Sequence, residues 1–254
     1  MSDKAVVLVG GSGPLGRRLR EQLNASGRAT VNIDLRHDGG DYADPLDLCF
    51  YGVDACREAS LTEVRDALAS QGLEFDGLVS LVAFNPPPGI GIGSYDLAKF
   101  DVDQWETELR ANVTSAAITC KVFGGVMVRQ GYGSIVLVAS DLGVIAPDQR
   151  IYKSLGAGVF KSPAYTVGKH AIVGLAKHAA TFWAASGVRC NAISPGPIGP
   201  LDSPALEQEL TARIPLGRLA KVEEVASCIQ FLLSSEASFI TGANYSVDGG
   251  RSTW

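Results

Sequence analysis

The chain has 254 residues, of which 46% are hydrophobic and 19% charged, a balance typical of a globular protein with a sizeable core. The net charge of −5 gives no general attraction for phosphate backbones or anionic lipids, so nucleic-acid and membrane-surface binding are disfavoured. No apolar run approaches the roughly 20 residues that span a bilayer, and the first ten residues lack a cleavable signal layout. We therefore expect a soluble cytoplasmic protein.

The cysteines and histidines form no recognisable disulfide or metal pattern. None of the five cysteines belongs to a C-x-x-C pair, and the three histidines make no ligand motif with them. An odd, scattered set of cysteines is typical of reduced thiols, and we interpret all five as small buried hydrophobic residues. The sequence therefore predicts no disulfide and no metal site.

Short β-rich runs alternate with longer helical stretches along the chain. The pattern predicts, in order, a strand at 6–9, a helix at 15–25, a strand at 29–35, a helix at 60–70, a strand at 78–84, a long helix at 105–129, a strand at 134–139, a helix at 164–185, a strand at 188–193, a helix at 223–233 and a strand at 245–247. Ser60 and Glu63 have capping-box spacing, which predicts a helix start at Ser60. Apolar strands that alternate with helices predict one α/β domain, a doubly wound parallel sheet of the Rossmann type.

A glycine-rich loop follows the first predicted strand. Gly11, Gly13 and Gly16 match G-x-G-x-x-G between a strand and a helix, which is the context in which such a loop binds a pyrophosphate. Glycines let the backbone approach the phosphates, and the helix N-terminus supplies unpaired N–H groups. Pro14 fits the first helical turn, where its missing N–H would have no partner. The alternative is a glycine-rich turn without a ligand, and the context favours the dinucleotide site.

Asp34 ends the second predicted strand, 18 residues after Gly16. A carboxylate about 20 residues beyond the glycines accepts hydrogen bonds from the adenosine ribose, and it also repels a 2′-phosphate. We therefore predict NAD rather than NADP as the cofactor. Arg17 and Arg36 could instead meet a phosphate, but we interpret them as solvated charges.

Tyr165 and Lys169 form a Y-x-x-x-K pattern inside a predicted helix. The spacing of four places both side chains on one face, one turn apart. A phenol is a poor base at neutral pH, but a nearby ammonium favours the phenolate. By itself the pair is more typical of a surface tyrosine and lysine on an amphipathic helix, so its interpretation as a catalytic pair depends on the rest of the chain.

Several other segments occur in one order with this pair. They are the glycine loop, Asp54, Asn112, Ser140, the segment 191–196, Thr241-Gly242 and the segment 247–250. As a set they resemble the short-chain dehydrogenase/reductase family, in its compact single-domain branch, over essentially the whole chain. The resemblance implies an NAD-dependent oxidoreductase that acts on a small-molecule alcohol or ketone by hydride transfer.

The resemblance also implies a role for each matching residue. Tyr165 would be the general acid/base at the substrate oxygen, and Ser140 would hydrogen-bond that oxygen. Lys169 would bind the nicotinamide ribose and lower the tyrosine pKa, while Asn112 would hold a water of the proton relay. The implied cofactor contacts are Gly10, Ser12, Gly13, Pro14, Leu15, Gly16, Asp34, Leu35, Asp54, Ala55, Val82, Ala83, Tyr165, Lys169, Pro195, Gly196 and Ile198.

The chain departs from the family pattern at four places. The opening Thr-Gly is Val9-Gly10, with a glycine spacing closer to the extended branch, and the Asn-Asn-Ala-Gly after the fourth strand is Ser-Leu-Val-Ala at 80–83. The threonine often found after Pro-Gly is replaced near Pro200. The interval between Ser140 and Tyr165 is 25 residues, longer than is usual in the family, and implies an insertion.

The insertion leaves alternatives for two of the catalytic positions. Ser154 and Ser162 are the alternative serines if Ser140 is misassigned. Tyr152 lies nearer to Ser140 but has Gly156 rather than lysine four residues on, so we reject it as the base. It could line the substrate pocket or pack the insertion.

Substrate choice should lie with the loops at about 84–100, 141–163 and 197–216. Their cations suggest an anionic substrate, such as a phosphorylated or acidic sugar, although surface charges are usually only solvated; these cations are Arg150, Lys153, Lys161 and Arg213. The resemblance implies a homotetramer or homodimer, with contacts from the long helix, the Tyr165 helix and the C-terminal tail.

Three functions remain open from the sequence. The first is an NAD-dependent alcohol dehydrogenase or ketone reductase. The second is a catalytically silent dinucleotide-binding sensor, which has no need of the Tyr165 and Lys169 pair. The third is an NAD-using sugar dehydratase or epimerase, favoured by the glycine spacing and opposed by the chain length. Net NADH formation from alcohols separates the first from the other two.

Overall fold

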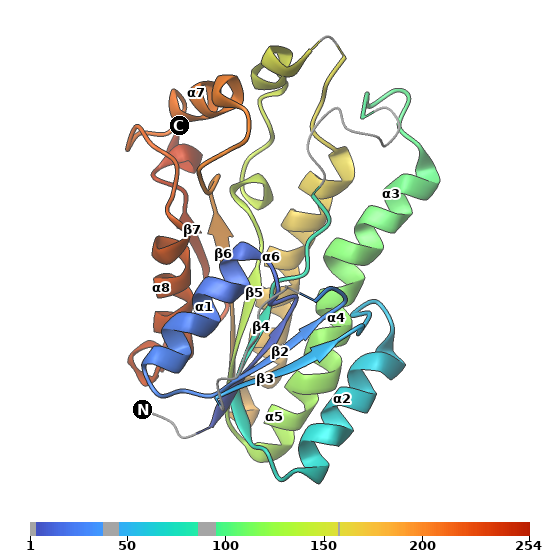
Figure 1. Cartoon of the computed structure of the whole chain (residues 1–254), viewed down its shortest axis with the longest axis vertical. Coiled ribbons are helices and arrows are strands. Elements are labelled where there is room, and N and C mark those ends of the chain that lie inside the picture. The colour runs from blue at the N-terminus through green and yellow to red at the C-terminus, as the bar shows by residue number, and fades with distance from the viewer. Residues whose placement is uncertain (1–3, 38–45, 86–94, 157) are drawn as a thin grey trace.

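A computed structural model describes residues 4–37, 46–85, 95–156 and 158–254 of the chain. The strands in these residues lie in one parallel sheet. Its order is β3-β2-β1-β4-β5-β6-β7, with helices on both faces (Figure 1). The strands are β1 (Ala5–Val9), β2 (Thr30–Asp34), β3 (Asp47–Tyr51), β4 (Phe75–Ser80), β5 (Gly133–Val138), β6 (Val188–Pro195) and β7 (Asn244–Val247). The prediction of a doubly wound parallel sheet is therefore confirmed.

The helices follow the strands in alternation. They are α1 (Pro14–Ala25), α2 (Glu58–Ser70), α3 (Val102–Leu109), α4 (Ser115–Thr119), α5 (Gly125–Gln130), α6 (Pro163–Trp183), α7 (Pro204–Thr211) and α8 (Val222–Leu233). The three helices α3, α4 and α5 form one continuous helix, the predicted long one, joined by π-helical turns at Arg110–Thr114 and Cys120–Gly124.

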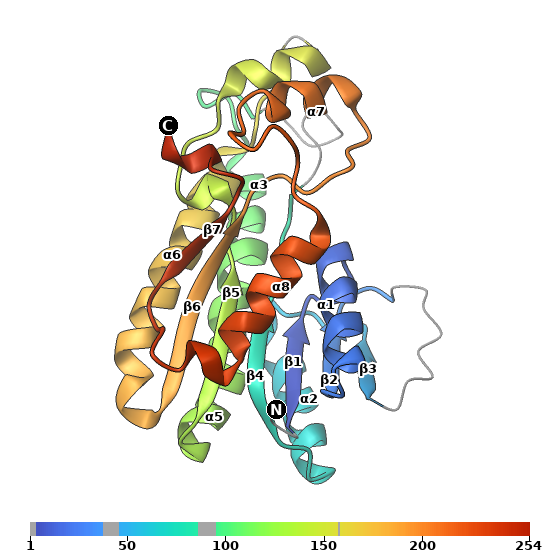
Figure 2. The ribbon, with the colours of Figure 1, turned by 90° about the vertical axis from the view of Figure 1, so that its left-hand side faces the viewer.

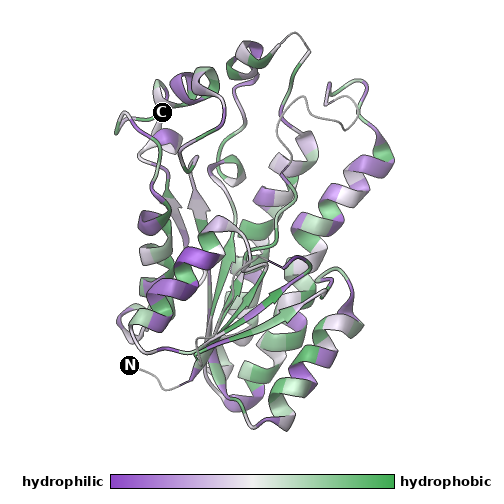
Figure 3. Cartoon of the chain, in the orientation of Figure 1, coloured by the Kyte–Doolittle hydropathy of each residue, from purple (hydrophilic) through white to green (hydrophobic). Residues whose placement is uncertain are grey.

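The core lies on both faces of the sheet. Val7 and Val9 of β1 pack in one cluster with α2, the long helix and α6, whereas Val6 and Leu8 pack in another with α1 and α8. Figure 2 shows α1 and α8 on one face, and Figure 3 shows the apolar colouring concentrated on the strands. Because successive side chains of a strand point to opposite faces of the sheet and both faces are buried, the strands are continuous apolar runs in the sequence.

Local details of the prediction were wrong at several points. Strand β3 and helix α7 were not predicted. Helix α2 begins at Glu58 rather than Ser60, because the Ser60 N–H already bonds the Arg57 carbonyl, so Ser60 is not its N-cap. Only Cys120 and Cys190 are fully buried, whereas the other three cysteines are half-buried; all five are free.

The long helix Val102–Gln130 is apolar enough to cross a membrane by length and hydropathy alone, contrary to the expectation that no apolar run approaches that length. Half of its most apolar window is buried, and it packs against α6, α2 and β5. Packing inside the protein therefore accounts for its apolar residues.

Candidate active site

The predicted site residues collect at the carboxyl ends of β1, β2, β4, β5 and β6. In a parallel sheet these ends share one edge, and in a doubly wound sheet they line the crevice where ligands bind. The chain therefore brings segments from all along the sequence to one place.

The glycine loop fits a dinucleotide. Gly10 has φ +87°, and a Cβ there would lie 2.6 Å from the Val82 nitrogen, so the loop packs tightly on the segment after β4. A Cβ on Gly16 would lie 2.5 Å from the Gly11 Cα, which fixes α1 against the loop. A Cβ on Gly13 meets nothing within 4 Å, so the backbone there faces open space. Gly13 is also the N-cap of α1 and offers no side chain to its unpaired N–H groups, which leaves them for a pyrophosphate.

A buried arginine, Arg20 of α1, contacts the backbone of the glycine loop. The Arg20 guanidinium donates to the Gly11 carbonyl at 3.4 Å and forms an ion pair with Asp47 of β3. Both partners are almost fully buried, so the pair ties α1, the loop and the edge strand together. This pair has no local signal in the sequence, because Arg20 meets Asp47 only through the edge strand β3.

Asp34 is fixed at the end of β2, where the ribose of a dinucleotide would lie. Its Oδ2 accepts from the Ser12 N–H at 2.9 Å, and its Oδ1 accepts from the Arg36 N–H at 3.0 Å. The side chains of Arg17 and Arg36 belong to exposed residues. The arrangement presents a carboxylate, rather than a built cation site, to the 2′ position.

Replacing Asp34 with Ser tests the choice of cofactor. We expect the ratio of kcat/KM with NADP to that with NAD to rise by about 100-fold, because the carboxylate that repels the 2′-phosphate is gone. Asp66→Asn, which removes the same charge from the exposed surface of α2, should leave the ratio unchanged. A wild-type enzyme that already prefers NADP would contradict the assignment.

The other predicted cofactor residues also lie along this edge. Asp54 follows β3, and its Oδ1 accepts from the Cys56 N–H at 2.8 Å. Ala55 is buried and Leu35 is exposed. Val82 and Ala83 follow β4, Pro195 ends β6, and Gly196 and Ile198 follow β6. Ile198 forms an isolated β-bridge with Ala220.

Tyr165 and Lys169 lie on α6, both buried and on one side of the helix as the spacing predicts. The Lys169 Nζ lies 5.6 Å from the centroid of the Tyr165 ring and donates to the Val138 carbonyl at 3.0 Å. Burial, together with the charge of Lys161, lowers the pKa of Lys169 to about 8. The ammonium is therefore still charged at neutral pH, close to the phenol.

Ser140 stands beside the same phenol, at the end of β5. Burial raises the pKa of Tyr165 to about 12, while a hydrogen bond with Ser140 acts to lower it. The absence of a side chain on Gly143 lets the turn after Ser140 pack directly on α6, because a Cβ on Gly143 would lie 2.6 Å from the Lys169 carbonyl oxygen. The structure thus brings Ser140, Tyr165 and Lys169 together across the insertion.

A buried ion pair extends this group. Asp141 pairs with Arg251 from the C-terminal segment, and its Oδ1 accepts from the Ser140 hydroxyl at 2.8 Å. The Asp141 charge acts to raise the pKa of Tyr165. Neither residue was predicted, and no local pattern could have indicated the pair because 110 residues separate them.

Asn112 lies in the first π-helical turn of the long helix. Its amide nitrogen donates to the carbonyls of Phe84 and Glu108, each at 3.0 Å, and its oxygen accepts from the Phe84 N–H at 3.1 Å. The side chain therefore tethers the segment after β4. The water contact of Asn112 stays a prediction, and its π-helical turn is a distortion often found at functional sites.

The alternative serines lie elsewhere. The Ser154 hydroxyl bonds the Ile151 carbonyl at 2.9 Å on an exposed residue. Ser162 caps α6, and its hydroxyl donates to the buried Glu108 carboxylate at 2.5 Å. Neither hydroxyl is bonded to the Tyr165 phenol, so Ser140 is the serine that the geometry favours.

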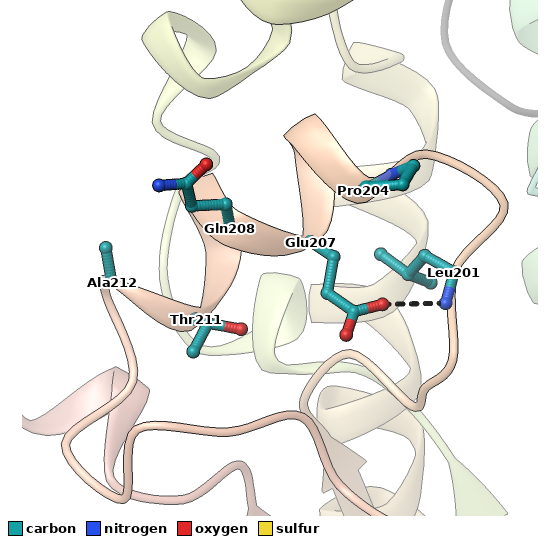
Figure 4. A pocket seen from close by; sticks show the side chains of 6 residues that line it. All are labelled: Leu201, Pro204, Glu207, Gln208, Thr211 and Ala212. Carbon is teal, nitrogen blue, oxygen red and sulfur yellow. Dashed lines mark hydrogen bonds between the residues drawn. The ribbon is translucent and has the colours of Figure 1, made fainter.

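The insertion packs against α7. Ile151 and Tyr152 form an apolar cluster with Leu210, Ile214 and Leu219, so Tyr152 packs the insertion. Of the predicted substrate loop at 84–100, residues 86–94 lie outside the described residues. A hollow on α7 (Figure 4) lies within the predicted substrate loop at 197–216 and is lined by Leu201, Pro204, Glu207, Gln208, Thr211 and Ala212. Its carboxylate, on Glu207, accepts from the Leu201 N–H at 3.0 Å.

Comparison with known proteins agrees with this geometry. A family model described as enoyl-(acyl carrier protein) reductase matches residues 15–252. Cis-4-hydroxycyclohexanecarboxylate dehydrogenase of Sinomonas cyclohexanicum is 33% identical, and the match covers 98% of this chain and 96% of that protein. The chain belongs to the short-chain dehydrogenase/reductase family. NAD-dependent glycerol dehydrogenase of Listeria innocua is 28% identical over 98% of this chain and 94% of its own.

A solved structure shows the same fold for this short-chain dehydrogenase/reductase. The short-chain dehydrogenase of Leptospira borgpetersenii, with bound NAD⁺, has a TM-score of 0.89 at 24% identity, over 99% of this chain and 94% of that one. The glycine loop and the Tyr165 and Lys169 pair match the family's pattern in position. The insertion and the C-terminal segment add buried charges beside that pair: Asp141, Lys161 and Arg251.

Proposed function

We propose that this protein interconverts a secondary alcohol and a ketone, with NAD as the hydride carrier. The observation that carries the proposal is the convergence of Ser140, Tyr165 and Lys169 beside a glycine loop that fits a dinucleotide. The related cyclohexanecarboxylate and glycerol dehydrogenases, by their names, act on hydroxyl-bearing small molecules. The proposed substrate class follows from both.

The residues would divide the chemistry between them. Bound NAD supplies the ring that accepts hydride, and its positive charge favours a phenolate nearby. Tyr165 takes the hydroxyl proton of the alcohol at its phenol oxygen and returns it when a ketone is reduced. Ser140 holds the substrate oxygen in line with that phenol, and Lys169 orients the nicotinamide ribose.

A panel of alcohols, offered with NAD to the purified protein, tests the proposal. Secondary cyclic alcohols, polyols, hydroxy acids and sugar derivatives are followed by NADH absorbance, and we expect net NADH from at least one class. NAD binding without NADH formation would favour the silent sensor, and product formation without net NADH would favour the dehydratase or epimerase. Oxidation of NADH by an enoyl thioester alone would favour the activity in the family model's description.

We also propose that the enzyme is a cytoplasmic homotetramer or homodimer. Large exposed apolar side chains support an assembly, because they are costly to leave in water: among them are Phe182, Phe239 and Trp254. The five free cysteines are consistent with a reducing compartment. Light scattering should give a multiple of 26.7 kDa, and the mass of a monomer would contradict the assembly.

A further inference from the structure

A second lysine lies against the proposed acid/base. Lys161 precedes α6, four residues before Tyr165, and its Nζ lies 4.3 Å from the centroid of the Tyr165 ring. The residue is only 8% exposed. Tyr165 therefore has buried ammonium groups from both Lys161 and Lys169 within 6 Å of its ring.

The position of Lys161 is well fixed. Its backbone N–H donates to the Gln149 Oε1 at 2.8 Å, and its carbonyl accepts from the Gln149 Nε2 at 3.3 Å. The Nζ donates to the Asn85 Oδ1, on an exposed residue that follows β4. The ammonium thus lies between the ring of Tyr165 and Asn85, which follows β4.

The Lys161 ammonium has no direct ion pair with a carboxylate among the described residues. Its hydrogen-bond partner is a neutral amide. Of the two buried carboxylates nearby, Asp141 pairs with Arg251 and Glu108 accepts from the Ser162 hydroxyl. Their charges act on Lys161, but neither forms an ion pair with it, and a buried ammonium without a direct ion pair is suited to an anionic ligand.

The protonation state of Lys161 allows this role. Burial lowers its pKa to about 8, partly offset by the nearby charges of Asp141 and Glu108. The ammonium is therefore present at neutral pH, with two of its three N–H donors not used by Asn85. An incoming anion would raise the pKa again and hold the charge in place.

The other cations of the substrate loops do not share this position. Arg150 is bound to Asp148, Arg213 is bound to Asp148 and Glu209, and Lys153 is exposed. A phosphate is usually held by several donors or by an arginine fork, whereas one ammonium with one positive charge matches a carboxylate. The geometry therefore favours a carboxylate over a phosphate.

We propose that Lys161 binds the carboxylate of a hydroxy-acid substrate whose reacting hydroxyl lies on the Tyr165 phenol. This inference rests on the proposed alcohol–ketone function and adds the substrate class to it. The carboxylate and the carbinol carbon would lie on the same side of the crevice, a few bonds apart, because Lys161 covers the ring that carries the reacting phenol.

Matched acid and ester pairs test the proposal. The purified enzyme with NAD is given 3-hydroxybutyrate, 3-hydroxycyclohexanecarboxylate and 4-hydroxycyclohexanecarboxylate, each beside its methyl ester. We expect kcat/KM for at least one acid to exceed that for its ester by about 30-fold or more, the range for a desolvated charge pair. Lys161→Met should remove this preference, Lys161→Arg should keep most of it, and Lys153→Met should leave it intact.

The readout is the acid-to-ester ratio, because a change in Tyr165 alone would alter both substrates together. Equal losses on acid and ester, or no wild-type preference for any acid, would overturn the proposal while leaving the alcohol–ketone function standing. NADH from neither form, with NADH from another alcohol of the panel, would also overturn the proposal, whereas NADH from no alcohol at all would contradict the function.

A binding measurement needs no turnover. Calorimetry with the enzyme–NADH complex should detect cyclohexanecarboxylate but not its carboxamide, and Lys161→Met should abolish that binding. If that variant does not fold, Lys161→Gln takes its place, since its amide can still meet Asn85. Equal binding of acid and amide would also overturn the proposal.

Discussion

Replacing Tyr165 with Phe should lower kcat by about 10²- to 10⁴-fold, the range expected when a general acid/base is removed. The ring remains to fill its buried site, so the change removes one oxygen and its bond with Ser140 rather than the packing. The Kd for NAD, measured by calorimetry, should stay near the wild-type value because the glycine loop and Asp34 are unchanged.

The matched control is Tyr152→Phe. Tyr152 is a second buried tyrosine, but it packs with the insertion and α7, so its phenol oxygen should matter far less to turnover. If the Tyr165 variant keeps more than a small fraction of its activity, the proton transfer must be assigned to another group. If both variants lose activity equally, the insertion rather than the phenol of Tyr165 controls turnover.

Replacing Lys169 with Met should abolish turnover and yet stabilise the folded protein at neutral pH. Burial lowers the pKa of this lysine from 10.5 to about 8. Between these values the unfolded chain binds more protons than the folded one, so stability rises with pH in that window. Below pH 8 the charged amine therefore costs the native state about 3 kcal/mol, by the usual conversion of a pKa difference.

The substitution removes this cost, but it also removes the hydrogen bond from Lys169 to the Val138 carbonyl, which stabilises the native state by about 1–2 kcal/mol. We expect a net increase of about 1–2 kcal/mol in the free energy of unfolding at pH 7, measured with urea, and no increase at pH 10. Lys177→Met, on the exposed surface of the same helix, should change neither value. If Lys169→Met instead lowers the free energy of unfolding at pH 7, Lys169 stabilises the native state rather than destabilising it.

The elements that the sequence predicted well are those with a strong local signal. The strands β1, β4, β5 and β6 are buried on both faces, and their apolar runs are plain in the sequence. Strand β3 was missed because it lies at the edge and begins with an acidic residue, Asp47, which is buried only because Arg20 of α1 meets it. Helix α7 is short and its apolar side packs on the insertion, so its pattern depends on a distant partner.

The long helix illustrates the same limit. Its existence followed from the periodicity, but its two π-helical turns did not. The first turn holds Asn112 against the segment after β4, where its side chain forms hydrogen bonds with the backbone of Phe84, 28 residues earlier in the chain. A contact of that kind has no signature in the local sequence.

By itself the sequence determined the fold class, the glycine loop and the shared face of Tyr165 and Lys169, because these depend on spacings within a few turns of chain. Only the tertiary structure decided which charges surround the phenol. The pairs Asp141–Arg251, Glu108–Ser162 and Lys161–Asn85 are 110, 54 and 76 residues apart. They meet because a parallel sheet gathers the carboxyl ends of its strands at one edge, where burial makes each charge depend on its neighbours.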